Sequence, residues 1–249
     1  MSISWLDIDW PAPPGVRLLS SFRGGGASAG PYASLNLGDH VGDDVKAVAE
    51  NRRALIAAAR VPSEPVWLKQ VHGANVADLD APGPYAASDA AIARRPLRVC
   101  AILTADCLPV VFATESGDTI AAAHAGWRGL NLGVLEATVK AMGASPQQLI
   151  AWLGPAIGPQ HFEVGAEVRE AFLARDPANA AAFLPNARGR FMADLGLLAR
   201  RQLQKLGITR IHGGGECTYA LAERYFSHRR DGITGRQGTF IWRDLADHR

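Results

Sequence analysis

The sequence has few of the features that mark secreted or membrane proteins. Its 249 residues include only three cysteines, Cys100, Cys107 and Cys217. An odd, widely spaced set of this kind does not suit a disulfide framework and indicates a reducing compartment. No run approaches the roughly 18 apolar residues of a membrane-spanning helix, and the first residues lack a basic stretch followed by an apolar run. We therefore expect a soluble, cytoplasmic protein.

The chain also lacks a strong excess of charge of either sign. The chain carries 26 basic and 24 acidic residues, for a net charge of +2, and no run of Lys or Arg exceeds two residues. This balance gives no broad basic face, so we expect neither nucleic acid nor a membrane surface as a partner. With 48% hydrophobic residues the chain can bury a large core, and its length fits a single domain over residues 1–249.

Short β-type runs alternate with helical patterns along the chain. Asp43 and Asp44 are placed to cap one helix, and Asp194 is placed to cap another that ends at Gly207. The runs around 65–71 and 75–79 predict a strand pair joined at His72-Gly73. Together the patterns predict an α+β layered domain with at least one large mixed sheet. The strands are expected at 16–22, 65–71, 75–79, 99–103, 110–113, 119–123, 150–153, 208–212 and 239–242, and the helices at 45–60, 131–142 and 195–206.

Three short segments each place a possible metal ligand beside a sharp turn. The ligands are His72, Cys107 and His124, and Gly or Pro flanks each of them. Their intervals of 35 and 17 residues match no zinc-finger or zinc-ribbon spacing. Each lies at the end of an expected strand, however, and loops at strand ends gather at one rim of a sheet. The residues alone leave two interpretations open. The three side chains could form one shared metal site, or His72 could be a turn histidine, Cys107 a small buried thiol and His124 part of a packed corner.

Several further segments, taken together with these three in their order along the chain, resemble the laccase-domain family, also named polyphenol oxidase or multicopper. Members of that family are described as purine nucleoside phosphorylases. The similarity runs nearly from end to end of the chain. The segments that carry it are Ser34–Gly38, Leu68–Gly73, Thr104–Val110, His124–Gly129, Gly154–Gly158, Phe162–Gly165, Cys217–Tyr219 and Phe226–Arg236.

The resemblance implies a fold, a metal and an activity. The implied fold is a four-layer α/β/β/α sandwich related to a group of cysteine hydrolases. The implied metal is zinc, held by His72, Cys107 and His124. The implied reaction is phosphorolysis of adenosine, inosine and guanosine, extending to S-methyl-5'-thioadenosine, with an accompanying adenosine deaminase activity. Purine nucleosides and phosphate would then be the partners of this protein.

The residues favour zinc over copper. A multicopper oxidase needs many histidines, usually in His-x-His pairs, whereas this chain has seven histidines and no such pair. A single electron-transfer copper usually adds an axial Met, and none of Met1, Met142 and Met192 adjoins a candidate ligand. A thiolate and two imidazoles with an open fourth position are the pattern of a catalytic zinc site.

Residues for the reaction itself follow from what phosphorolysis and deamination require. Asp106 adjoins a ligand and could either hydrogen-bond a ligating histidine or act as an acid or base. Asn36 could bind sugar hydroxyls or pin its own turn. The basic side chains that could hold phosphate or a base edge, unless solvent simply surrounds them, are Arg52, Lys69, Arg128, Arg229 and Arg236.

Three other functions stay open at this point. A cysteine hydrolase would use Cys107 as nucleophile with His124 or His72 as base. A binding module without catalysis would keep the metal as a staple for the fold. A copper-dependent polyphenol oxidase is the third.

Overall fold

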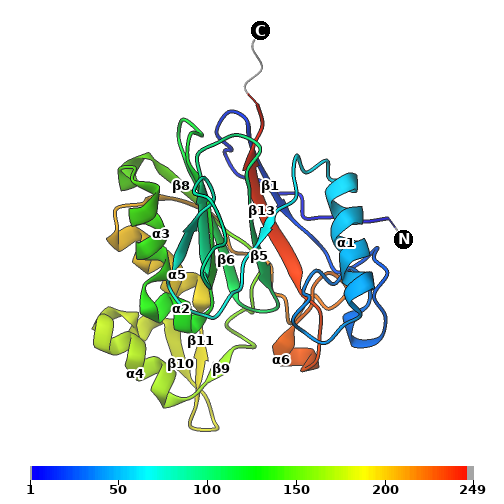
Figure 1. The fold of residues 1–249 in the computed structure, drawn as a ribbon. Coiled ribbons are helices and arrows are strands. Elements are labelled where there is room, and N and C mark those ends of the chain that lie inside the picture. Colours follow the sequence, from blue (N-terminus) through cyan, green and yellow to red (C-terminus); the bar gives the residue numbers. More distant parts are fainter. Residues whose placement is uncertain (1, 246–249) are drawn as a thin grey trace.

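Three β-sheets organise residues 2–245, the part of the chain that the computed structural model describes (Figure 1). Two of the sheets are large, and each mixes parallel and antiparallel pairs, so the prediction of an α+β fold with a mixed sheet is confirmed. In spatial order, the four-stranded sheet consists of β1 (Val16–Ser20), β13 (Gln237–Arg243), β5 (Val99–Thr104) and β2 (Val66–Trp67), and the six-stranded sheet of β12 (Arg210–Gly213), β8 (Leu149–Leu153), β6 (Leu108–Thr114), β7 (Ile120–Ala125), β4 (Ala90–Ala93) and β3 (Val76–Asp78).

Helices cover the outer faces of the two large sheets. Helix α1 (Val45–Ala58) lies on the four-stranded sheet, where Leu55 joins the apolar cluster beneath it (Figure 1). Helices α3 (Val134–Met142) and α5 (Leu195–Lys205) lie on the six-stranded sheet, where Val139 is part of the largest cluster. Within residues 2–245 no helix combines the length and apolar character that crossing a bilayer requires.

A separate apolar cluster fills the space between the two sheets. It joins Cys100, Ile102 and Ile241 of the four-stranded sheet to Val111 and Ile120 of the six-stranded sheet. All five side chains are at most 1% exposed. Because the central strands are covered on both faces, β4, β5, β6, β7 and β8 are buried along their whole length instead of on alternate residues. Across the molecule the layers are therefore helix, sheet, sheet and helices.

Of the three aspartates predicted to cap helices, Asp44 and Asp194 are confirmed, whereas the Asp43 side chain bonds Ser28 and Asn36 instead. The Asp44 side chain accepts hydrogen bonds from the backbone N–H groups of Lys46 and Ala47 at the start of α1. The Asp194 side chain accepts one from Leu197 at the start of α5. Each carboxylate satisfies N–H groups that have no partner inside the helix, which fixes where the helix begins.

The predicted strand pair around His72-Gly73 is wrong. Strand β2 pairs with β5 in the four-stranded sheet, whereas β3 pairs with β4 in the six-stranded sheet. The turn between them does not form a hairpin: it carries the chain from one sheet to the other, with His72 in the left-handed region at φ 60°. Alternating apolar residues on both sides of a turn look the same in sequence whether the strands pair with each other or with different partners.

The helix predicted over 131–142 is two helices. Helix α2 (Trp127–Leu132) begins immediately after the third ligand segment, and α3 follows it. Gly133 separates them with φ 89°, a conformation that ends one helix and that residues with a side chain rarely adopt.

A small third sheet was not predicted. It consists of β10 (Phe183–Pro185), β11 (Phe191–Ala193) and β9 (Glu163–Val164), and α4 (Ala166–Arg175) follows β9 in the chain. These strands are only two or three residues long, too short to show a period of two. The remaining short elements are η1 (Gly30–Tyr32), η2 (Pro146–Gln148), η3 (Pro177–Ala182) and α6 (His228–Asp231).

Candidate metal centre

The three segments predicted to carry ligands meet in space. One ligand atom from each of His72, Cys107 and His124 lies within 4.8 Å of the other two. His72 lies in the connection from β2 to β3, Cys107 in the turn from β5 to β6, and His124 on β7 itself, not beyond its end as the sequence pattern indicated. The cluster therefore joins both large sheets.

The spacing of these atoms suits a tetrahedral metal ion. Zinc binds a thiolate at about 2.3 Å and an imidazole at about 2.0 Å, which places a sulfur and a nitrogen ligand about 3.5 Å apart. The Cys107 Sγ and His72 Nε2 atoms are 3.9 Å apart. The rings of His72 and His124 meet edge to face, with their centroids 4.7 Å apart. A small inward movement of the side chains would bring all three to bonding distance of one ion, with a fourth position left for another group.

The backbone around the cluster is shaped for close approach. Both His72 and Asp106 have positive φ angles, 60° and 90°, which residues other than glycine rarely adopt. A Cβ atom at Gly126 would lie 2.9 Å from Cys107 Sγ and 3.3 Å from the His72 ring. Gly126 is thus the residue whose missing side chain leaves room for the ligands.

A buried carboxylate, which the sequence reasoning missed, organises two of the ligands. Asp89 is 0% exposed, and its Oδ1 lies 2.8 Å from His124 Nδ1. The carboxylate also accepts hydrogen bonds from the backbone N–H groups of Val71, His72 and Gly73, at 3.1, 2.8 and 2.7 Å. Because the carboxylate can only accept, His124 Nδ1 carries a proton, and Nε2 is the ring nitrogen that would bind a metal in place of its own proton.

The electrostatics of the cluster favour charged forms. Burial opposes ionisation of Asp89, but the hydrogen bonds from His124 and the backbone of the His72 turn outweigh it and lower the pKa of the carboxyl group. Burial also opposes charge on Cys107 and His124, yet their mutual attraction lowers the pKa of the Cys107 thiol and raises the pKa of His124. The thiolate that a metal ion needs is therefore accessible at neutral pH.

Among the described residues, Asp89 and not Asp106 is the carboxylate that hydrogen-bonds a candidate ligand histidine, His124. The Asp106 carboxylate instead accepts hydrogen bonds from Thr218 Oγ1 and from the backbone N–H of Arg229, each at 2.7 Å. It is 8% exposed and lines the cavity beside the cluster. The carboxylate thus ties the Cys107 turn to the C-terminal part of the chain, and its catalytic role stays a prediction.

A cavity of about 220 Å³ opens beside the ligands. Two of the predicted arginines line it: Arg128, whose guanidinium lies 4.5 Å from the centre of the Trp127 ring, and Arg229, whose guanidinium lies 5.2 Å from that of Phe162. The full lining comprises His72, Ala105, Asp106, Cys107, Trp127, Arg128, Ile157, Phe162, His228 and Arg229.

Arg236 also lies near the cluster, although it does not line this cavity. Burial lowers the pKa of Arg236, and the neighbouring negative charges of Cys107 and Asp106 oppose that shift. Its guanidinium donates to the backbone carbonyls of Thr234 and Gly235. Arg236 therefore adds positive charge next to the thiolate.

The other predicted substrate contacts lie elsewhere. Asn36 is 0% exposed, and its amide bonds to Gly38, Asp43 and Arg236, so it pins two loops together. Arg52 lies 4.0 Å over the Trp67 ring and lines a different cavity. Lys69 is exposed and lines none of the described cavities near the ligands. The structure brings none of these three side chains into the lining of the cavity beside the ligands.

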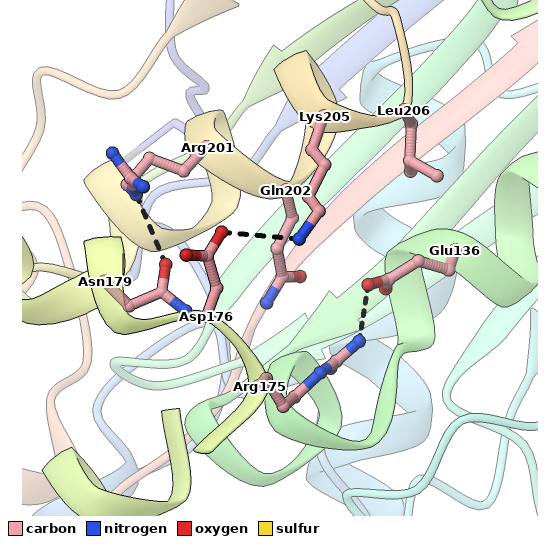
Figure 2. A pocket seen from close by; sticks show the side chains of 8 residues that line it. All are labelled: Glu136, Arg175, Asp176, Asn179, Arg201, Gln202, Lys205 and Leu206. Carbon is pink, nitrogen blue, oxygen red and sulfur yellow. Dashed lines mark hydrogen bonds and ion pairs between the residues drawn. The ribbon is translucent and has the colours of Figure 1, made fainter. Parts of the chain in front are cut away.

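A second cavity of about 200 Å³ lies between α3, α4 and α5 (Figure 2). Its charged side chains pair with one another: Arg175 with Glu136 at 2.7 Å, and Lys205 with Asp176 at 3.4 Å. Arg201 Nε donates to Asn179 Oδ1 at 3.2 Å. No group of three His, Cys, Asp or Glu side chains with converging ligand atoms is found in its lining.

The fold and the cluster together define a mixed α+β protein with a three-ligand candidate metal centre. The chain belongs to the multi-copper polyphenol oxidoreductase laccase family, whose sequence pattern matches residues 17–244. This confirms the resemblance in the motifs.

Named relatives and solved structures agree with the family assignment. The chain is 53% identical over 235 residues to purine nucleoside phosphorylase YfiH of Escherichia coli (strain K12), covering 94% of this chain and 96% of that protein. It is 51% identical over 240 residues to purine nucleoside phosphorylase PA4543 of Pseudomonas aeruginosa, covering 96% and 98%. The crystal structure of Neisseria meningitidis protein NMB0706 matches with a TM-score of 0.92 at 43% identity, covering 98% of this chain and 100% of that one.

Proposed function

We propose that this chain is a zinc-dependent purine nucleoside phosphorylase of the cytoplasm. The observation that carries the proposal is the convergence of His72, Cys107 and His124 beside a cavity that also holds arginine and aromatic side chains. The relatives also support the proposal. The Escherichia coli and Pseudomonas aeruginosa proteins are named purine nucleoside phosphorylases, and about half of their residues are identical to this chain over nearly their whole lengths.

The donor set fits zinc better than copper. A thiolate and two imidazoles are common zinc ligands, and no thioether lines the cavity beside them. His72, Cys107 and His124 would hold the ion. Zinc bound there would act as a Lewis acid and as a template for an oxygen atom of the substrate or of phosphate.

The arginines supply what phosphate requires. Arg128 and Arg229 line the cavity, and Arg236 places a third guanidinium near Cys107. The Arg229 guanidinium is held by the backbone carbonyl of Glu163 at 2.7 Å and by the Phe162 ring, so its direction is fixed before phosphate arrives. Oriented positive charge of this kind stabilises phosphate as it approaches the anomeric carbon of the ribose.

The apolar wall of the cavity suits a purine. Trp127, Ile157 and Phe162 lie on it together. Aromatic faces stack on flat heterocycles and exclude water from the glycosidic bond. The proposed substrates are adenosine, inosine and guanosine, together with S-methyl-5'-thioadenosine, whose 5' substituent lies far from the bond that breaks.

Deamination of adenosine is proposed as an activity of the same cavity. It needs water oriented at the purine six-position and a group that moves protons, and Asp106 is the carboxylate that lines the cavity. This activity predicts inosine formation that persists without phosphate, whereas phosphorolysis requires phosphate.

The experiment that tests the main proposal is direct. Purified protein loaded with one equivalent of zinc is given adenosine and phosphate, and ribose 1-phosphate is measured. We expect ribose 1-phosphate in an amount equal to the free purine bases adenine and hypoxanthine together, with no ribose 1-phosphate in the absence of phosphate. The proposal is overturned if zinc-loaded protein forms no ribose 1-phosphate from adenosine, inosine or guanosine and no 5-methylthioribose 1-phosphate from S-methyl-5'-thioadenosine.

The close approach of Cys107 and the two histidines also fits a cysteine hydrolase. That function predicts activity in metal-free protein and loss of it on alkylation of Cys107. A metal-stapled binding module predicts unfolding when a chelator removes the metal. A copper-dependent polyphenol oxidase predicts phenol oxidation by copper-loaded protein. Activity that disappears with chelator while the protein stays folded, and returns with zinc, excludes all three.

A further inference from the structure

His228 lines the cavity beside the metal ligands and was not among the residues predicted from the sequence. It begins the short helix α6, and its Nδ1 lies 2.6 Å from the carbonyl oxygen of Gly232. Because a carbonyl oxygen only accepts hydrogen bonds, Nδ1 must carry a proton. The remaining ring nitrogen, Nε2, is therefore the one free to bind or release a proton.

A short bridge fixes His228 relative to the ligands. The backbone N–H of its neighbour Arg229 donates to Asp106 Oδ2 at 2.7 Å, and Asp106 directly precedes Cys107. Ser227 caps the same helix by accepting from the backbone N–H of Arg230. His228 is thus linked to the candidate metal ligand Cys107 through two residues, Arg229 and Asp106, which this hydrogen bond joins. Positioning of this kind is what proton transfer to a bound substrate requires.

The other charged or titratable groups in the cavity lining are poor proton donors. His72 and Cys107 would be occupied by the metal. Asp106 already accepts two hydrogen bonds, and an ionised carboxylate is only an acceptor. Arg128 and Arg229 keep their protons. Among the described residues that line the cavity, His228 is left as the side chain with a ring nitrogen that can carry a proton and release it to a substrate.

We propose that His228 is the general acid that protonates N7 of the departing purine, an inference that rests on the proposed function. In the step, a phosphate oxygen forms a bond to C1' of the ribose while the bond from C1' to N9 breaks. The electron pair of that bond passes into the purine ring, and N7 takes the proton from Nε2 of the imidazolium. Ribose 1-phosphate and the neutral base leave, and the neutral imidazole regains a proton from solvent.

The sharpest test compares guanosine with 7-methylguanosine in zinc-loaded protein carrying His228→Asn. The asparagine amide can take the place of Nδ1–H at the Gly232 carbonyl, but it has no counterpart of Nε2. Loss of a general acid lowers turnover by about 10²–10⁴-fold, which we expect with guanosine. The imidazolium ring of 7-methylguanosine already carries the positive charge, so we expect this substrate to keep the wild-type rate.

Further measurements separate the possible outcomes. The variant should bind one zinc with wild-type affinity, and His212→Asn, on β12 outside the cavity lining, should behave as wild type. An unchanged guanosine rate, or equal losses on both substrates, overturns the role of His228 alone. If the wild-type protein phosphorolyses no nucleoside, the proposed function itself is overturned, and this outcome differs from a failure of the His228 role alone.

Discussion

Two cavities of similar volume, about 220 and 200 Å³, are lined by charged side chains, but their charges are organised differently. Beside the metal ligands, the fully buried Asp89 carboxylate holds one ligand by its side chain and another by its backbone. In the cavity between α3, α4 and α5, partly exposed side chains form ion pairs with each other (Figure 2). A candidate ligand site is therefore distinguished by side chains that converge on one point and are held by a buried carboxylate. The volume of the cavity does not distinguish it.

Removing the Cys107 thiolate should have the largest effect on the metal centre. For Cys107→Ser we expect loss of bound zinc and turnover at or below about a hundredth of wild type, because a hydroxyl is a poor zinc ligand. Metal analysis and ribose 1-phosphate formation measure both. Cys217→Ser is the matched control, since Cys217 lies outside the ligand cluster and its sulfur accepts a hydrogen bond from the backbone N–H of Gly158. A zinc-loaded, active Cys107→Ser protein would contradict the ligand assignment.

Replacing the anchor should weaken the site without deleting a ligand. Asp89→Asn loses the charge that holds His124 and the His72 turn, and we expect zinc affinity to fall by about 10–100-fold. Competition with a chromophoric chelator measures this. Asp78→Asn is the control, because Asp78 forms an ion pair with Arg94 in which both side chains are about two-fifths exposed. Equal zinc affinity in both variants would show that Asp89 does not organise the ligands.

Filling the space at Gly126 tests the close approach of the ligands. Its backbone, at φ −64°, accepts alanine, but the new methyl group would lie 2.9 Å from Cys107 Sγ. We expect Gly126→Ala to cost about 1–3 kcal/mol through overpacking and to reduce zinc affinity. Gly24→Ala is the control, since an added Cβ there meets nothing within 4 Å. Calorimetry and zinc titration that fail to distinguish the two variants would refute this account of Gly126.

The buried carboxylate also predicts how stability depends on pH in metal-free protein. The pKa of Asp89 is lower in the folded than in the unfolded state, so its contribution is present above the unfolded pKa and is lost as pH falls through the folded pKa. We expect the free energy of unfolding of wild type to drop more between neutral and acidic pH than that of Asp89→Asn. Urea unfolding at a series of pH values checks this, and parallel curves would contradict it.

The smallest effect is expected in the other cavity. Glu136→Gln removes the ion pair with Arg175, whose side chains are 32% and 36% exposed. Pairs with this exposure contribute about 0–1 kcal/mol, so the free energy of unfolding should change by no more than that. Zinc affinity and turnover should equal those of wild type. A loss of turnover in Glu136→Gln would show that the cavity between α3, α4 and α5 takes part in the reaction, which contradicts this account.

The three candidate ligands could be picked out of the sequence because part of their signal is local, although only the order of the motifs favoured a shared site. His72, Cys107 and His124 each stand beside a turn at a strand end, and the order of the motifs linked them. Helix caps such as Asp44 and Asp194 were predictable for the same reason, since a cap acts within three residues.

The parts that depend on long-range pairing could not be predicted. Nothing local shows that the His72 turn passes between sheets, because the partners of β2 and β3 come later in the chain. Asp89 was missed because its bonds reach residues 16 to 35 positions away. A carboxylate directly before the wholly apolar strand β4 was the one available signal.

Zinc titration into metal-free protein, with phosphorolysis of adenosine followed at each point, tests the central claim most directly. We expect activity to rise in proportion to zinc and to stop rising at one equivalent per chain, with the Cys107→Ser protein silent throughout. Full activity in protein without metal, or activity that ignores the bound zinc, would contradict a three-ligand zinc centre at His72, Cys107 and His124.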